Sequence, residues 1–173
     1  MSMLSNLDLI RRVPLFAMLT PAQAESLAGA VTKRRFKRGE FLVEQGKNCE
    51  SLFIILAGRA RVVVTDRRDR EVILATMHPG DYVGEMSLID HEPHSASVEA
   101  EVQTDALVLG GAEFTRCLLE NTSTVSAVMR GLVQRLRSAD RKIESLALMN
   151  VYGRVANVLM EQAPDDRELL IRL

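Results

Sequence analysis

The sequence lacks tryptophan, contains only two cysteines among 173 residues, and is only 4% aromatic. Cys49 and Cys117 lie far apart and form no CxxC motif, so neither a disulfide framework nor a zinc or iron–sulfur site is predicted. No apolar run approaches the roughly eighteen residues of a membrane span. With a net charge of −1, the chain lacks the positive electrostatic potential that is typical of nucleic-acid-binding domains. These absences predict a cytoplasmic chain that contacts no membrane.

A helix is predicted to begin near Thr20. Residues 20–23, TPAQ, combine a threonine cap, a proline at the first helical position and a glutamine placed to bond back to the cap. Small and apolar residues then repeat at helical spacing: Ala24, Leu27, Ala28 and Val31. The helix is therefore expected to include Val31.

From Phe36 to about Leu109 the pattern changes to short runs rich in Val, Ile and Leu, separated by glycines or polar turns. The expected strands are residues 40–44, 51–57, 59–65, 71–77, 82–83, 95–100 and 106–109. Residues 66–69, DRRD, predict a polar hairpin loop. Many short strands with such turns indicate an α+β protein built on an antiparallel β-roll, of the jelly-roll or double-stranded β-helix kind, with flanking helices.

A long helix is predicted over residues 124–149. Its apolar residues alternate four and three apart: Val125, Met129, Leu132, Leu136, Ala139, Ile143 and Leu146. A seam of about three heptads favours a two-stranded coiled coil, and hence a homodimer. The alternative is a helix packed on its own roll. Beyond it, a helix over 151–162 capped by Asn150 and a short strand over 169–173 are predicted.

Residues 80–88, GDYVGEMSL, combine a strand end, a glycine turn and a short helical turn. A helix N-terminus beside a glycine offers backbone N–H donors that suit a phosphate. Glu85, an acceptor when ionised, suits a sugar hydroxyl, and Ser95 can donate to a phosphate oxygen. The alternative is that Gly84 only forms a turn and Glu85 is only a solvated carboxylate.

The order Gly80-Asp81, Gly84-Glu85 and Ser95-Ala96 resembles the phosphate-binding cassette of cyclic-nucleotide-binding domains, specifically those of the catabolite-activator (CRP/FNR) regulators. The similarity continues through Arg135-Leu136 and residues 146–156. It implies a parallel dimer, a cyclic nucleotide held between roll and long helix, and a winged-helix domain missing from this chain, through which alone DNA and RNA polymerase would be contacted. The implied division is 1–118 for the roll, 119–149 for the dimerisation helix and 150–173 for the start of the DNA-binding domain.

The resemblance also assigns the ligand contacts: Gly84, Glu85, the backbone of Met86 and Ser87, His94 and Ser95 in the cassette, with Arg135, Ala139 and Asp140 on the long helix. Where the family has an arginine that pairs with the phosphate, this chain has His94, whose charge is not permanent. Where the catabolite activator bonds adenine with a threonine, it has Ala139. Both departures weaken the prediction of cyclic AMP as the effector.

Some family members respond to cyclic di-GMP, which needs a wider and more basic site. Five basic residues on the long helix could supply one: Arg130, Arg135, Arg137, Arg141 and Lys142. Cyclic di-GMP is therefore predicted as the effector in place of cyclic AMP. The alternative is that these basic residues only form the solvated flank of a coiled coil.

Two rival functions remain open. One is a constitutive dimerisation module with a vestigial pocket. The other is a regulatory domain of a channel or kinase, which residues 153–156, GRVA, argue against because they lead towards a winged helix. His91 and His94 lack a third metal ligand, and Ser87 with His91 has no catalytic motif around it. We expect no enzyme activity, catalytic cofactor or metal.

Overall fold

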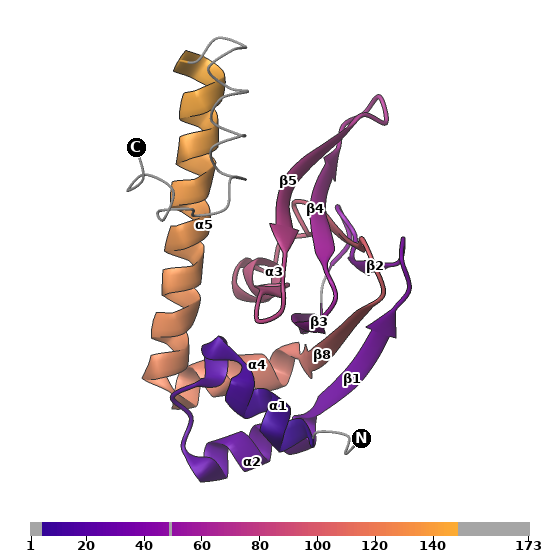
Figure 1. Cartoon of the computed structure of the whole chain (residues 1–173). Helices are drawn as coiled ribbons and strands as arrows, with labels where there is room; N and C mark the ends of the chain where they lie inside the picture. The colour runs from indigo at the N-terminus through magenta and orange to yellow at the C-terminus, as the bar shows by residue number, and fades with distance from the viewer. Residues whose placement is uncertain (1–4, 49, 149–173) are drawn as a thin grey trace, which may run out of the picture. The chain divides into compact units, whose positions relative to one another are not determined.

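The computed structural model describes residues 5–48 and 50–148, which form two four-stranded sheets with helices around them (Figure 1). The chain divides into two compact units, residues 1–128 and 129–173. Cys49, the helix predicted over 151–162 and the strand predicted over 169–173 lie outside the described residues.

All strand pairs are antiparallel. The first sheet has the order β1 (Val31–Phe36), β8 (Thr104–Gly110), β3 (Ser51–Ala57), β6 (Tyr82–Val83). The second has the order β2 (Phe41–Val43), β7 (Ser97–Ala100), β4 (Ala60–Thr65), β5 (Glu71–Met77). Each of the seven predicted strands overlaps one of these, so the predicted antiparallel β-roll within an α+β fold is confirmed.

Strand β1 corrects the prediction for the N-terminal region. Helix α2 (Pro21–Ala30) ends one residue before Val31, which begins a strand instead of completing the helix. The reason is tertiary: Val31 pairs with Leu109 and Phe36 with Thr104, so β8 supplies the hydrogen-bonding partner. Tertiary pairing overrides the apparent helical spacing here.

Helices α1 (Asn6–Arg12) and α2 each begin with a capping box. At the start of α2, Gln23 N–H donates to Thr20 Oγ1 at 3.3 Å and Thr20 N–H donates to Gln23 Oε1 at 2.9 Å, which confirms the predicted capping box. The other helical elements of the first unit are the 3₁₀ turn η1 (Pro14–Phe16), α3 (Glu85–Asp90) and α4 (Gly111–Glu120). Helix α4 packs on β3 and β8.

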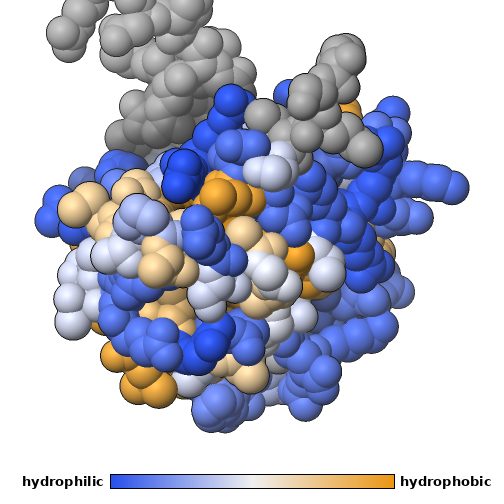
Figure 2. Space-filling model, turned by 90° about the horizontal axis from the view of Figure 1, so that it is seen from below, coloured by the Kyte–Doolittle hydropathy of each residue, from blue (hydrophilic) through white to orange (hydrophobic). Residues whose placement is uncertain are grey.

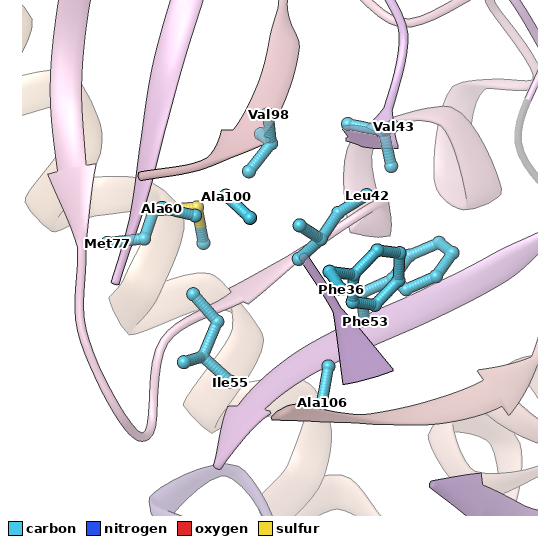
Figure 3. Close-up of a cluster of buried hydrophobic side chains, with 10 residues drawn as sticks. All are labelled: Phe36, Leu42, Val43, Phe53, Ile55, Ala60, Met77, Val98, Ala100 and Ala106. Carbon is cyan, nitrogen blue, oxygen red and sulfur yellow. The ribbon is translucent and has the colours of Figure 1, made fainter. Parts of the chain in front are cut away.

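One cluster of buried hydrophobic side chains lies inside the roll, where both sheets contribute to it (Figure 3). Its buried members are Phe36, Leu42, Val43, Phe53, Ile55, Ala60, Met77, Val98, Ala100 and Ala106. The rings of Phe36 and Phe53 meet edge to face, with centroids 6.0 Å apart. Since β1, β2, β3, β4, β5, β7 and β8 all contribute to this cluster, its packing holds the two sheets together.

The face of the first unit that is seen from below is hydrophilic over much of its area, with several hydrophobic patches among the hydrophilic residues (Figure 2). Helix α5 (Thr122–Leu148) is the predicted long helix, whose second part belongs to the second unit. Four of its predicted seam residues leave 61, 62, 64 and 69% of their surface exposed: Met129, Leu136, Ile143 and Leu146. Much of this apolar seam is therefore exposed in the single chain, whereas Val125 and Leu132 are half-buried.

Candidate functional site

The short helix α3 follows β6 through a glycine in a conformation that side chains disfavour. Gly84 has φ +105° and is buried, and helix α3 starts at the next residue. At the other end His91 has φ +61°, and its N–H donates to Ser87 O at 3.0 Å. The glycine is needed because a Cβ is strained at this φ. The predicted strand, glycine turn and short helix are therefore all present.

The first turn of α3 alternates buried and exposed side chains. Glu85 is only 1% exposed and Ser87 is 6% exposed, whereas Met86 is 49% exposed. A carboxylate at this burial is shielded from water, which strengthens any hydrogen bond that it accepts. The backbone N–H groups at the start of a helix lack intrahelical partners and can serve an anion.

His94 is fixed by its backbone on one side and by its ring on the other. Its N–H donates to Lys47 O at 2.9 Å, and its carbonyl accepts from Gly46 N–H at 2.8 Å. The ring Nδ1 lies 3.1 Å from Ser87 Oγ. The side chain is only 9% exposed, and this burial lowers the pKa of the imidazole. Burial therefore favours the neutral form of the ring, whereas an arginine at this position would stay charged.

His94 also lines a hollow of about 190 Å³ in the first unit. Its walls are Leu42, Val43, Glu44, Lys47, Asn48, Glu50, Ser51, Phe53 and His94. Of the charged residues in this lining, Glu44 and Lys47 form an ion pair at 2.7 Å. The hollow is thus polar on the side of the loop between β2 and β3 and apolar on the side of the strands.

The structure brings some of the predicted ligand residues together. Gly84, Glu85, Met86 and Ser87 are consecutive at the start of α3, and His94 joins them through Ser87. Ser95 is exposed beside His94. The remaining three lie on the part of α5 in the second unit, where all are exposed: Arg135, Ala139 and Asp140.

One side chain of this site was not predicted. Ser87 was expected to contribute only its backbone, yet its hydroxyl is the partner of His94. The two residues are seven apart, on a helix and on the loop that follows it, so no helical or strand spacing connects them. Within residues 5–48 and 50–148 no group of three or more His, Cys, Asp or Glu could hold a metal, and no helix there could cross a membrane.

Residues 33–121, just over half of the chain, match the family model described as the cyclic nucleotide-binding domain. The chain belongs to this cyclic nucleotide-binding domain family. It is 30% identical over 139 residues to the cAMP-activated global transcriptional regulator Vfr of Pseudomonas aeruginosa. The aligned region covers 77% of this chain and 65% of Vfr. The chain thus spans less than two thirds of that relative. The predicted similarity to the catabolite-activator regulators is confirmed.

Solved structures agree with this cyclic nucleotide-binding domain assignment. The crystal structure of the Thermus thermophilus catabolite activator protein matches with a TM-score of 0.67 and 28% identity, over 78% of this chain and 63% of that chain. The c-di-GMP-responsive global regulator CLP of Xanthomonas campestris matches with a TM-score of 0.73 at 20% identity, over 84% of this chain and 74% of that chain. The second likeness shows a shared fold.

Proposed function

We propose that the chain is the ligand-sensing and dimerising part of a cyclic nucleotide-responsive transcription regulator. The match of residues 33–121 to the cyclic nucleotide-binding domain carries this proposal. The nucleotide would bind at the cassette of the roll (1–118) and bias the pair of dimerisation helices (119–149) between two arrangements. Residues 150–173 would lead to a DNA-binding domain, through which alone DNA and RNA polymerase are contacted.

Within the cassette, each proposed contact has a chemical reason. Glu85 accepts a hydrogen bond from the ribose 2′-hydroxyl, and its burial strengthens that bond. Ser95 and the backbone N–H groups of Met86 and Ser87 donate to the cyclic phosphate. His94 supplies a further donor, but not the permanent bidentate charge of an arginine.

Cyclic di-GMP is the proposed ligand, because His94 and Ala139 each lack an interaction that cyclic AMP uses in this family. Arg135, Arg137 and Arg141 are exposed on α5 and suit guanine edges and a second phosphate. Cyclic AMP is the second candidate, because Vfr is cAMP-activated by name.

A calorimetric titration of the whole chain with cyclic AMP, cyclic GMP and cyclic di-GMP tests this function. We expect cyclic di-GMP to bind more tightly than the other two, and Arg135→Ala to weaken it about tenfold through a lost guanine or phosphate contact. Arg11→Ala, which removes an exposed arginine from α1, is the matched control and should change nothing. If the site instead serves cyclic AMP, His94→Arg should strengthen that ligand by about tenfold or more.

Two results would contradict the ligand assignment. Tight binding of cyclic AMP that His94→Arg leaves unchanged would show that the departures from the family pattern are harmless. Binding of no cyclic nucleotide by wild type or either variant would favour the alternative, a constitutive dimerisation module with a vestigial pocket.

A further inference from the structure

The buried contact between Ser87 and His94 has a chemical property that the function described above does not use. A serine hydroxyl both donates and accepts hydrogen bonds, whereas each imidazole nitrogen does one or the other, depending on where the protons are. Ser87 Oγ and His94 Nδ1 are 3.1 Å apart, and both side chains are buried. The hydroxyl can therefore serve the ring in more than one charge state.

In the neutral ring, the Ser87 hydroxyl donates to Nδ1, which leaves the proton on Nε2. In the charged ring, Nδ1–H donates to Ser87 Oγ instead. The hydrogen bond survives the change, because only the hydroxyl has to rotate. In both states Nε2–H remains a donor, which is the group that an anion requires.

Burial, and not the neighbouring charged groups, decides the direction in which the pKa of His94 is shifted. From the loop between β2 and β3, Glu44 and Lys47 neutralise each other as an ion pair, and Glu50 lines the same hollow. From α3, the nearest acid in sequence to Ser87 is Glu85. Burial lowers the pKa of His94, and no neighbouring charge offsets this effect.

We propose that Ser87 is a positioning residue that keeps His94 Nε2 a donor towards the phosphate of a bound cyclic nucleotide, and that binding adds one solvent proton to His94. The proposal rests on the proposed function, since it needs a phosphate-bearing ligand at the cassette. It applies equally to cyclic AMP and cyclic di-GMP, because both carry an ionised phosphodiester.

The sign of the effect follows from linkage. A phosphate beside the ring raises the pKa of His94 in the bound state, whereas burial keeps it low in the free state. Between these two values the bound protein carries one proton more than the free protein. Affinity is therefore highest below the free-state pKa and falls by up to about tenfold per pH unit until the bound-state pKa is passed.

Calorimetry on the whole chain from about pH 6 to about pH 8 tests this coupling. With cyclic AMP or cyclic di-GMP as the probe, affinity should fall as pH rises. The binding enthalpy should depend on the ionisation enthalpy of the buffer, with uptake approaching one proton per site. His94→Arg should bind without pH dependence or proton uptake. His78→Gln, which removes an exposed histidine, is the matched control and should keep the wild-type profile.

The role of Ser87 has its own variants. Ser87→Ala should weaken nucleotide binding roughly tenfold, the cost of one lost polar contact, and flatten the pH profile. Ser87→Thr, which keeps a hydroxyl, should restore both. Should Ser87→Ala fail to fold, as judged by circular dichroism, the wild-type pH profile and the His94→Arg comparison still decide the proton coupling.

The outcomes separate this inference from the proposed function. Nucleotide binding by wild type that is independent of pH overturns the proton coupling and leaves the function standing. Binding by His94→Arg but not by wild type at any pH also overturns it, since His94 then never becomes an effective donor. Binding by neither protein at any pH overturns both. A Ser87→Ala variant with wild-type affinity and pH profile would show that Ser87 does not position His94.

Discussion

Replacing Leu136 by aspartate should convert the chain from a dimer to monomers. Leu136 lies in the middle of the predicted heptad seam and leaves 62% of its surface exposed in the single chain. In a coiled coil this surface would be buried against the partner helix, and two carboxylates there would lose water without gaining a cation. We expect at least about 100-fold weaker association, the equivalent of about 3 kcal/mol.

Sedimentation velocity at roughly tens of micromolar measures this change. Gln134→Asp introduces the same carboxylate at an exposed position outside the seam and should leave the dimer intact. A wild-type chain that sediments as a monomer at this concentration would show that α5 is not a dimerisation helix.

Replacing Gly58 by alanine should destabilise the fold by roughly 3 kcal/mol or more, the sum of a strained backbone and a steric clash. Gly58 has φ +92° between β3 and β4, and a Cβ there would clash with Gln103 O and lie 2.7 Å from Thr104 Cα. Thr104 cannot move away easily, because its hydroxyl both accepts and donates a hydrogen bond. Thr104 Oγ1 accepts from Arg59 N–H at 3.2 Å and donates to Val102 O at 2.9 Å.

Urea unfolding at a fixed protein concentration measures the loss, since a dimer's stability depends on concentration. Gly46→Ala separates the two contributions. Gly46 also has a positive φ, +77°, but apart from the residue itself and its two chain neighbours no heavy atom would lie within 4 Å of a Cβ there. It should cost only about 1–2 kcal/mol. Equal losses for the two variants would mean that the close approach at Gly58 contributes nothing.

The sequence predicted most of the roll because its strands are short apolar runs with glycine or polar turns between them. It failed at β1, where Val31 and Phe36 enclose four polar or charged residues. The pairing that makes this segment a strand joins Val31 to Leu109, far along the chain. Local propensity contains no information about such a distant partner, so the sequence pattern alone could not predict this strand.

The candidate site was predictable to a similar degree. The glycine turn before Glu85 is visible because only glycine adopts its φ readily. The burial of Glu85 and the hydrogen bond between Ser87 and His94 depend on how α3 packs against the following loop, which no spacing encodes. The roles of Arg135 and Asp140 as ligand contacts stay predictions.

Strand β5 has a consequence for how copies of the chain behave towards one another in solution. It is the outer strand of its sheet, and three consecutive apolar residues on it are 59, 57 and 43% exposed: Val72, Ile73 and Leu74. Such an edge can template a strand from another molecule. The exposed Arg67 and Arg68 in the adjoining turn would oppose such pairing, because the arginines of two copies repel each other. Because salt screens this repulsion, colloidal solubility should fall as ionic strength rises.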